Sequence, residues 1–168
     1  MYVKTNIVME KIDEMLTKPY WVIDILPEQV PAESGGQYFK IAQYLLNNPQ
    51  KNEIYQTFAR VIIKLNCYYL ITVGNPDKGW KRNPHPQSLA RQLSECAAGL
   101  YPLFVMVPES DAMLYLSGDE HYITCYNLNP ELQRLLGILA QSEGLFLWQP
   151  EQVPAPALEE ESVEEEGV

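Results

Sequence analysis

The chain has 168 residues, of which 46% are hydrophobic and 20% are charged, and its formal net charge is −10. This length fits one domain whose core needs no metal or disulfide, and the composition excludes collagen, a coiled-coil rod and a wholly disordered chain. Seven of the 22 acidic residues lie in 151–168, a segment without lysine or arginine, so residues 1–150 carry 15 acids against 12 bases, a net charge of −3. The body of the protein is therefore too weakly acidic to mimic nucleic acid.

Hydrophobic periodicity and turn residues predict five helices and six strands. Their expected order is helix 8–16, strand 20–26, helices 38–46 and 54–65, strand 67–73, helix 89–100, strands 103–107, 113–116 and 122–126, helix 132–139 and strand 145–148. Asn48-Pro49 and Asn129-Pro130 each place a capping residue and a first-turn proline at the start of a helix.

The three strands between residues 103 and 126 follow one another too closely to be joined by helices, so they must pair antiparallel. The expected fold class is therefore α+β, with a mixed, mainly antiparallel sheet of about five or six strands and about five helices packed against it. We expect a single α+β domain over residues 1–150. Residues 151–168 are expected to form a disordered acidic tail, because their prolines and glutamates leave little to bury.

The three cysteines, Cys67, Cys96 and Cys125, are odd in number and form no CxxC pair, which does not indicate a disulfide framework. Each lies in an apolar segment that suits a small buried hydrophobe, so we expect all three to be structural. The first residues lack the apolar stretch of a signal peptide, and no apolar run is long enough to span a membrane. These features favour a cytoplasmic protein with reduced thiols.

No residues form a recognised catalytic, nucleotide-binding or metal-binding motif. The run Asp119-Glu120-His121 fits a polar hairpin tip better than a metal site. Asp24 interrupts an apolar strand, and strand alternation favours a side chain that points to solvent or to a helix cap over a buried acid. We therefore predict no catalytic residues, no cofactor and no metal, and the sequence favours a protein that is not an enzyme.

Residues 74–86 are expected to form a long polar loop between a strand and a helix, and such loops often carry function. The candidate partner-binding residues are Lys78, Trp80, Lys81, Arg82 and His85. Because the flanking cations resist burial, we expect Trp80 to be offered to a partner at the surface rather than folded onto the core. The acidic tail could also dock on this basic patch.

The function favoured by the sequence is a small cytoplasmic, non-catalytic protein-interaction module, such as an adaptor or an immunity-like or antitoxin-like regulator. Eleven tyrosines and three tryptophans support it, because these residue types are enriched at interfaces. One alternative is a ligand-binding or enzymatic α+β domain whose pocket is assembled from distant residues. Another is weak single-stranded nucleic-acid binding through residues 78–91. We expect a protein partner rather than nucleic acid or a membrane; the oligomeric state is left open.

Overall fold

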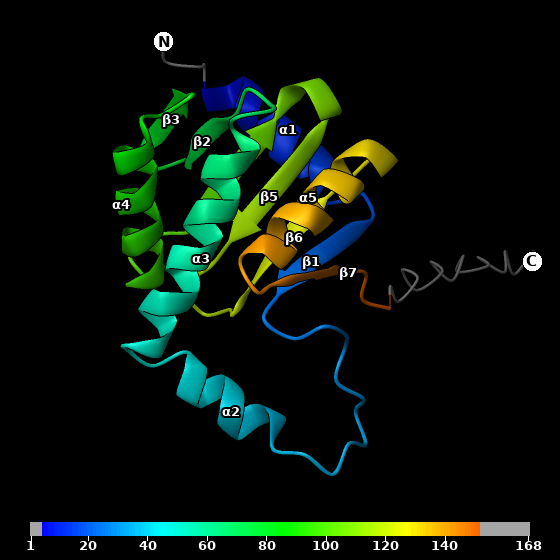
Figure 1. Cartoon of the computed structure of the whole chain (residues 1–168). Coiled ribbons are helices and arrows are strands. Elements are labelled where there is room, and N and C mark those ends of the chain that lie inside the picture. Colours follow the sequence, from blue (N-terminus) through cyan, green and yellow to red (C-terminus); the bar gives the residue numbers. More distant parts are fainter. Residues whose placement is uncertain (1–4, 152–168) are drawn as a thin grey trace, which may run out of the picture.

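The computed structural model describes residues 5–151, which form one antiparallel sheet with helices on both faces (Figure 1). The elements are α1 (Thr5–Met15), β1 (Tyr20–Asp24), α2 (Tyr38–Leu45), α3 (Gln50–Leu65), β2 (Thr72–Asn75), β3 (Gly79–Arg82), α4 (Pro86–Ala97), β4 (Leu103–Val107), a short 3-10 helix (Pro108–Ser110), β5 (Ala112–Leu116), β6 (Tyr122–Tyr126), α5 (Pro130–Ser142) and β7 (Phe146–Trp148). The expected α+β class with five helices is confirmed. The tail beyond residue 151 lies outside the described residues.

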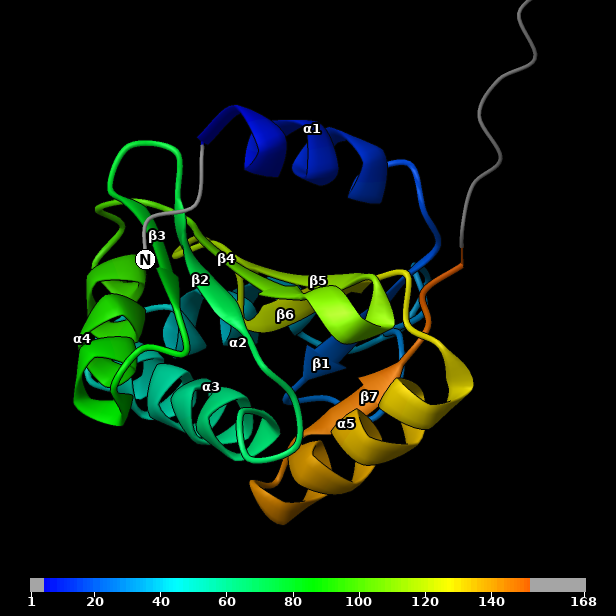
Figure 2. The same ribbon diagram turned by 90° about the horizontal axis from the view of Figure 1, so that it is seen from above.

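The sheet has seven strands in the order β3-β2-β4-β5-β6-β1-β7, and every neighbouring pair is antiparallel. The strands of 103–126 pair in sequence as expected, whereas β1 inserts between β6 and β7 although it precedes them by far in the chain. Figure 2 shows the resulting layers, with α1 on one face of the sheet and α3, α4 and α5 on the other.

The seventh strand lies where the sequence predicted a loop. Residues 72–82 form a tight hairpin, with β2 paired to β3. The turn is closed by Asn75, whose Oδ1 accepts hydrogen bonds from the backbone N–H groups of Asp77 (2.9 Å) and Lys78 (3.0 Å). Gly79 has φ +84°, and a Cβ on Gly74 would lie 2.0 Å from the carbonyl oxygen of Gly79. Gly74 and Gly79, which lie in the stretch expected to be a loop, are thus requirements of the hairpin.

Strand alternation divides the core between the two faces of the sheet. The odd-numbered residues Ile23 of β1 and Ile123 and Cys125 of β6 are fully buried in the cluster that includes α3, α4 and α5, and Trp21 packs against it partly buried. On the opposite face a smaller cluster joins α1 to β3, β4 and β5; its buried members are Val8, Ile12, Met15, Trp80, Met106 and Met113. The even-numbered residues of β1 and β6 therefore lie on the α1 face, beside this cluster.

The three cysteines differ in their burial. Cys96 and Cys125 are buried, as predicted, but Cys67 is exposed, so its expected burial is wrong. Residues 66–70 form a turn after α3 rather than the start of a strand, and this places Cys67 at the surface.

Among residues 5–151, no helix is both long enough and apolar enough to cross a membrane.

Candidate functional site

A groove of about 410 Å³ lies on the α1 face of the sheet, over β6, β1 and β7. We call it the aromatic groove; its lining residues are Tyr20, Val22, Asp24, Gln29, Tyr38, Tyr122, Thr124, Tyr126, Trp148 and Pro150. The strand register brings them together, since Tyr20 pairs with Tyr126, Asp24 with Tyr122, and Val22 with both Thr124 and Trp148. Residues from four separate parts of the chain thus line one surface.

Asp24 and His121 form a buried pair at one end of this groove. The Nδ1 atom of His121 lies 2.9 Å from Oδ1 of Asp24, and both side chains are only 5% exposed. One expectation is therefore wrong, because Asp24 does not point to solvent or cap a helix. The run 119–121 does form the polar turn between β5 and β6, but its His121 is buried. The reason is the register of β1 on β6, which sets Asp24 opposite Tyr122 and so beside His121.

Tyr38, the first residue of α2, adds a third side chain to this pair. Its hydroxyl oxygen lies 3.1 Å from Nε2 of His121, and the two rings meet edge to face at a centroid distance of 5.9 Å. The hydrogen bond to Asp24 raises the pKa of His121 above its ordinary value, more than burial lowers it. A protonated His121 can donate one N–H to Asp24 and the other to Tyr38. We call Asp24, His121 and Tyr38 the latch.

The order Asp-His-Tyr resembles a catalytic triad in its hydrogen-bond connections. Burial, and then the charge of Asp24, raise the pKa of Tyr38, so the phenol stays neutral. The latch ties the start of α2 to the sheet across 83 residues of sequence.

The turn that carries His121 is itself held by α3. The Tyr55 hydroxyl donates to the backbone oxygens of Ser117 and Glu120, the latter at 2.9 Å. Gly118 packs so closely on α4 that a Cβ there would lie 2.4 Å from the carbonyl oxygen of Cys96. His121 is therefore presented to Asp24 by a turn that packing fixes on two sides.

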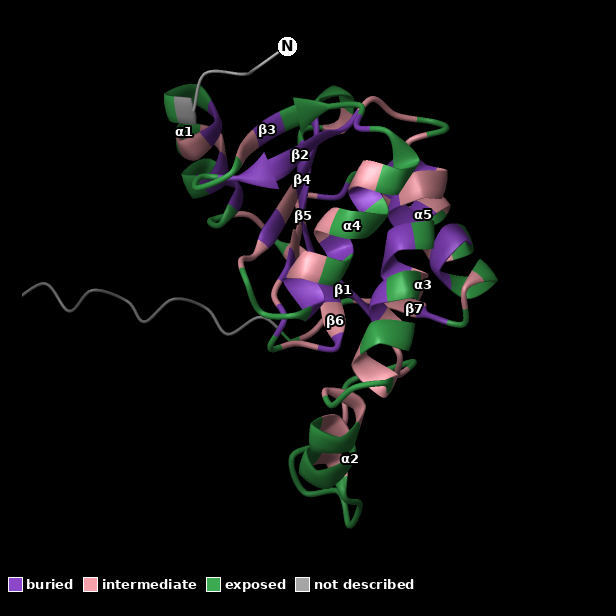
Figure 3. Ribbon diagram, turned by 90° about the vertical axis from the view of Figure 1, so that its left-hand side faces the viewer, coloured by how far each residue is buried: buried purple, intermediate pink, exposed green. Residues whose placement is uncertain are grey.

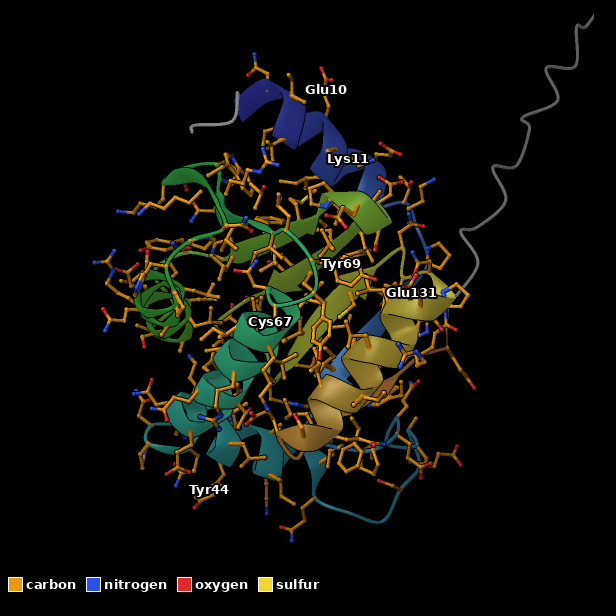
Figure 4. All side chains as sticks on the ribbon, turned by 45° about the horizontal axis from the view of Figure 1, so that its top comes forward. Glu10, Lys11, Tyr44, Cys67, Tyr69 and Glu131 are labelled. Atoms are coloured by element: carbon orange, nitrogen blue, oxygen red, sulfur yellow. The ribbon has the colours of Figure 1, made fainter. Side chains whose placement is uncertain are left out.

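Beyond the latch, α2 extends away from the body of the domain (Figure 3), and none of its residues is buried. Its large apolar side chains are open to solvent, with Phe39 84%, Tyr44 59% and Ile41 52% exposed. Tyr44 lies at the outer edge of the molecule in Figure 4. A helix of eight residues is too short to be stable alone in water, so the latch and the join to α3 must hold it in place.

The structure separates the residues that the sequence proposed for partner binding. Trp80 is only 2% exposed and packs with α1, its ring tilted against Phe104 at a centroid distance of 6.1 Å. The expectation that Trp80 is offered at the surface is therefore wrong. The reason is the position of β3: Trp80 faces α1 and packs in its cluster, Lys81 points to the other face, and Arg82 is exposed at the end of the strand.

The other predicted residues lie around the same hairpin. Lys78 places its Nζ 5.2 Å from the centre of the Tyr101 ring, a cation–π contact. His85 caps α4, because its Nδ1 accepts a hydrogen bond from the Gln87 N–H at 3.2 Å. A hollow of about 250 Å³ brings Lys78, Trp80 and Lys81 together with Arg91, but not with Arg82 or His85. Partner binding by this basic region stays a prediction.

The buried thiols and the acidic residues of the described chain show no reactive arrangement. Burial raises the pKa of Cys96 to about 11, which keeps its thiol protonated. Within residues 5–151, no three His, Cys, Asp or Glu side chains come together in a way that could hold a metal ion. Comparisons of this chain with known protein families, with curated proteins and with solved structures found no match.

Sequence reasoning missed the aromatic groove, although a signal for it was present. The second face carries Tyr20, Val22 and Asp24 in β1 and Tyr122, Thr124 and Tyr126 in β6, rather than a plain hydrophobic or charged series. Such a mixture of aromatic and polar side chains indicates a face that is neither core nor ordinary surface. Only the pairing of the two strands shows that the aromatic residues gather in one place.

Proposed function

We propose that this protein is a non-catalytic protein-interaction module that binds a protein partner through α2 and the adjoining aromatic groove. One observation carries the proposal. The helix α2 exposes Phe39, Ile41 and Tyr44 and buries no residue, yet the latch holds its first turn in a fixed place. Single exposed hydrophobes need no explanation, but three on one short helix indicate a docking element.

The groove and α2 are continuous, because Tyr38 belongs to both. An amphipathic helix presented beside an aromatic surface matches the residue types that dominate interface energetics, in which tyrosine, tryptophan and phenylalanine are enriched.

The test is capture of partners by the tagged full-length chain from extracts of the source cells, with matched variants on α2. Phe39→Ser combined with Ile41→Ser removes the two apolar side chains; Gln43→Ser changes an exposed polar residue of the same helix as a control. A specific partner should be retained by wild type and by the control and lost by the double variant. Its affinity should fall by about 2 kcal/mol, roughly thirtyfold, the scale of an interface hot spot.

Folding of each variant is checked by circular dichroism, since residues without burial should tolerate substitution. A partner that binds wild type and the folded double variant equally well would contradict the proposed role of α2.

A further inference from the structure

We infer that the aromatic groove is the subsite for a basic segment of the partner, and that it receives a lysine or arginine side chain. This inference rests on the proposed function and adds the chemical class of the partner. The groove combines aromatic rings with a single carboxylate and contains no base, and the acidic tail leaves the domain at its rim.

The charge of the lining is the first argument. Of the ten lining residues only Asp24 carries a formal charge, and none is a lysine or arginine. His121 offsets the Asp24 carboxylate whenever its imidazole is protonated. Two more carboxylates, Asp119 and Glu120, precede it on the same turn, and that of Glu120 acts on the His121 ring. Glu120 therefore adds negative charge beside the Asp24–His121 pair, although neither it nor Asp119 lines the groove itself.

The aromatic rings are the second argument. The rings of Tyr20 and Tyr126 lie 5.9 Å apart and tilted, and the Trp148 indole is fixed by a hydrogen bond from its Nε1 to the Leu26 carbonyl oxygen at 2.9 Å. Faces of tyrosine and tryptophan attract lysine and arginine through the ring quadrupole, and guanidinium groups also stack on them. The volume of about 410 Å³ is in the range of ligand pockets.

The place where the tail begins is the third argument. Pro150 lines the groove, and the backbone N–H of Glu151 donates to Oε1 of Gln29 at 3.2 Å. The sequence beyond carries six more glutamates, at 159–161 and 164–166. These charges raise the local concentration of a basic partner.

The same charges select against other occupants. A second copy of this chain, with its own net charge of −10, would be repelled by the first. The hollow at Lys78, Lys81 and Arg91 shares no lining residue with the groove, and its positive charges repel a basic segment. A basic segment of another protein is the occupant that the charges favour.

The probe for the test is a blocked pentapeptide with arginine at positions two and four and leucine at position three. A matched peptide replaces both arginines with citrulline, which keeps the shape and removes the charge. Binding to the full-length chain is followed by NMR through the indole N–H signal of Trp148, assigned with the Trp148→Phe variant. The arginine peptide should shift this signal saturably and bind at least tenfold more tightly than the citrulline peptide.

Three variants of the full chain complete the design. Tyr126→Leu removes one aromatic face and should weaken arginine-peptide binding at least fivefold, whereas Tyr68→Leu changes an exposed ring outside the groove and should not. Changing the glutamates at 159–161 and 164–166 to glutamine should weaken binding at low salt and make it less dependent on salt.

The inference is overturned by equal binding of the citrulline peptide, by no binding at all, by an unchanged affinity of folded Tyr126→Leu, or by shifts confined to the Lys78–Arg91 region. The peptide assay does not use the apolar side chains of α2. If the peptide does not bind but a captured partner still depends on Phe39 and Ile41, this inference is wrong and the proposed function stands. If the peptide binds but no captured partner depends on Phe39 and Ile41, the proposed role of α2 is contradicted.

Discussion

Replacing Trp80 with alanine should destabilise the protein strongly, because the ring is 2% exposed and joins α1 to the sheet. Truncation of a buried large aromatic costs about 3–5 kcal/mol. The indole Nε1 of Trp80 is buried without a hydrogen-bond partner in the described part of the chain, and such an atom costs roughly 1–3 kcal/mol. Replacing Trp80 with alanine also removes this unpartnered N–H group, so the expected loss of unfolding free energy lies at the low end of the range, about 3 kcal/mol.

Chemical denaturation measures this loss. With a slope of about 2 kcal/mol per molar urea, the midpoint should fall by about 1.5 M while the slope stays the same. Tyr68→Ala is the control, since its ring is 65% exposed and should change the midpoint little. Trp80→Phe keeps most of the packing and removes the unpartnered N–H, so it should cost less than half as much as alanine. A loss below about 1 kcal/mol for Trp80→Ala would refute the packing argument, and equal losses for phenylalanine and alanine would refute the argument from the N–H group.

Three other expectations follow from the described contacts. Because Asp24 raises the pKa of His121, stabilisation by the pair should be complete below about pH 6.5 and lost as pH rises through the folded-state pKa. Unfolding free energies at a series of pH values should show this fall in wild type and a flatter profile in Asp24→Asn; equal profiles would contradict it. Gly74→Ala should cost more than about 1 kcal/mol in the same unfolding assay because its Cβ meets backbone, whereas Gly35→Ala faces open space and should cost little. Cys67 should react with a thiol reagent in the native state, and the other two cysteines only on unfolding; a single fast phase with all three thiols would count against the burial assigned to them.

Local features of the chain were sufficient for most of the elements. The five helices were predictable because helical periodicity acts within a few residues. The start signal at Asn48-Pro49 was wrong, since Pro49 itself stands at the N-cap of α3 and no side chain caps that helix. The start signal at Asn129 was correct, since its Oδ1 accepts a hydrogen bond from the Leu132 N–H at 2.8 Å and starts α5 as the sequence indicated. The antiparallel order of β4, β5 and β6 followed from the shortness of their connections. Strand β3 was missed because Gly79, Lys81 and Arg82 are residue types typical of a loop and only Trp80 indicated burial.

The sequence by itself determined the α+β class, the helices and the three-strand meander, because these depend on interactions between residues near in the chain. Only the tertiary structure decided the burial of Trp80, the pairing of Asp24 with His121 and the formation of the aromatic groove. Asp24 and His121 are 97 residues apart, and no spacing rule connects them until β1 inserts between β6 and β7. Trp80 is buried because α1, from the far end of the chain, covers that part of the sheet. A side chain is assigned to core, surface or site by what packs against it, and here those neighbours come from distant parts of the chain.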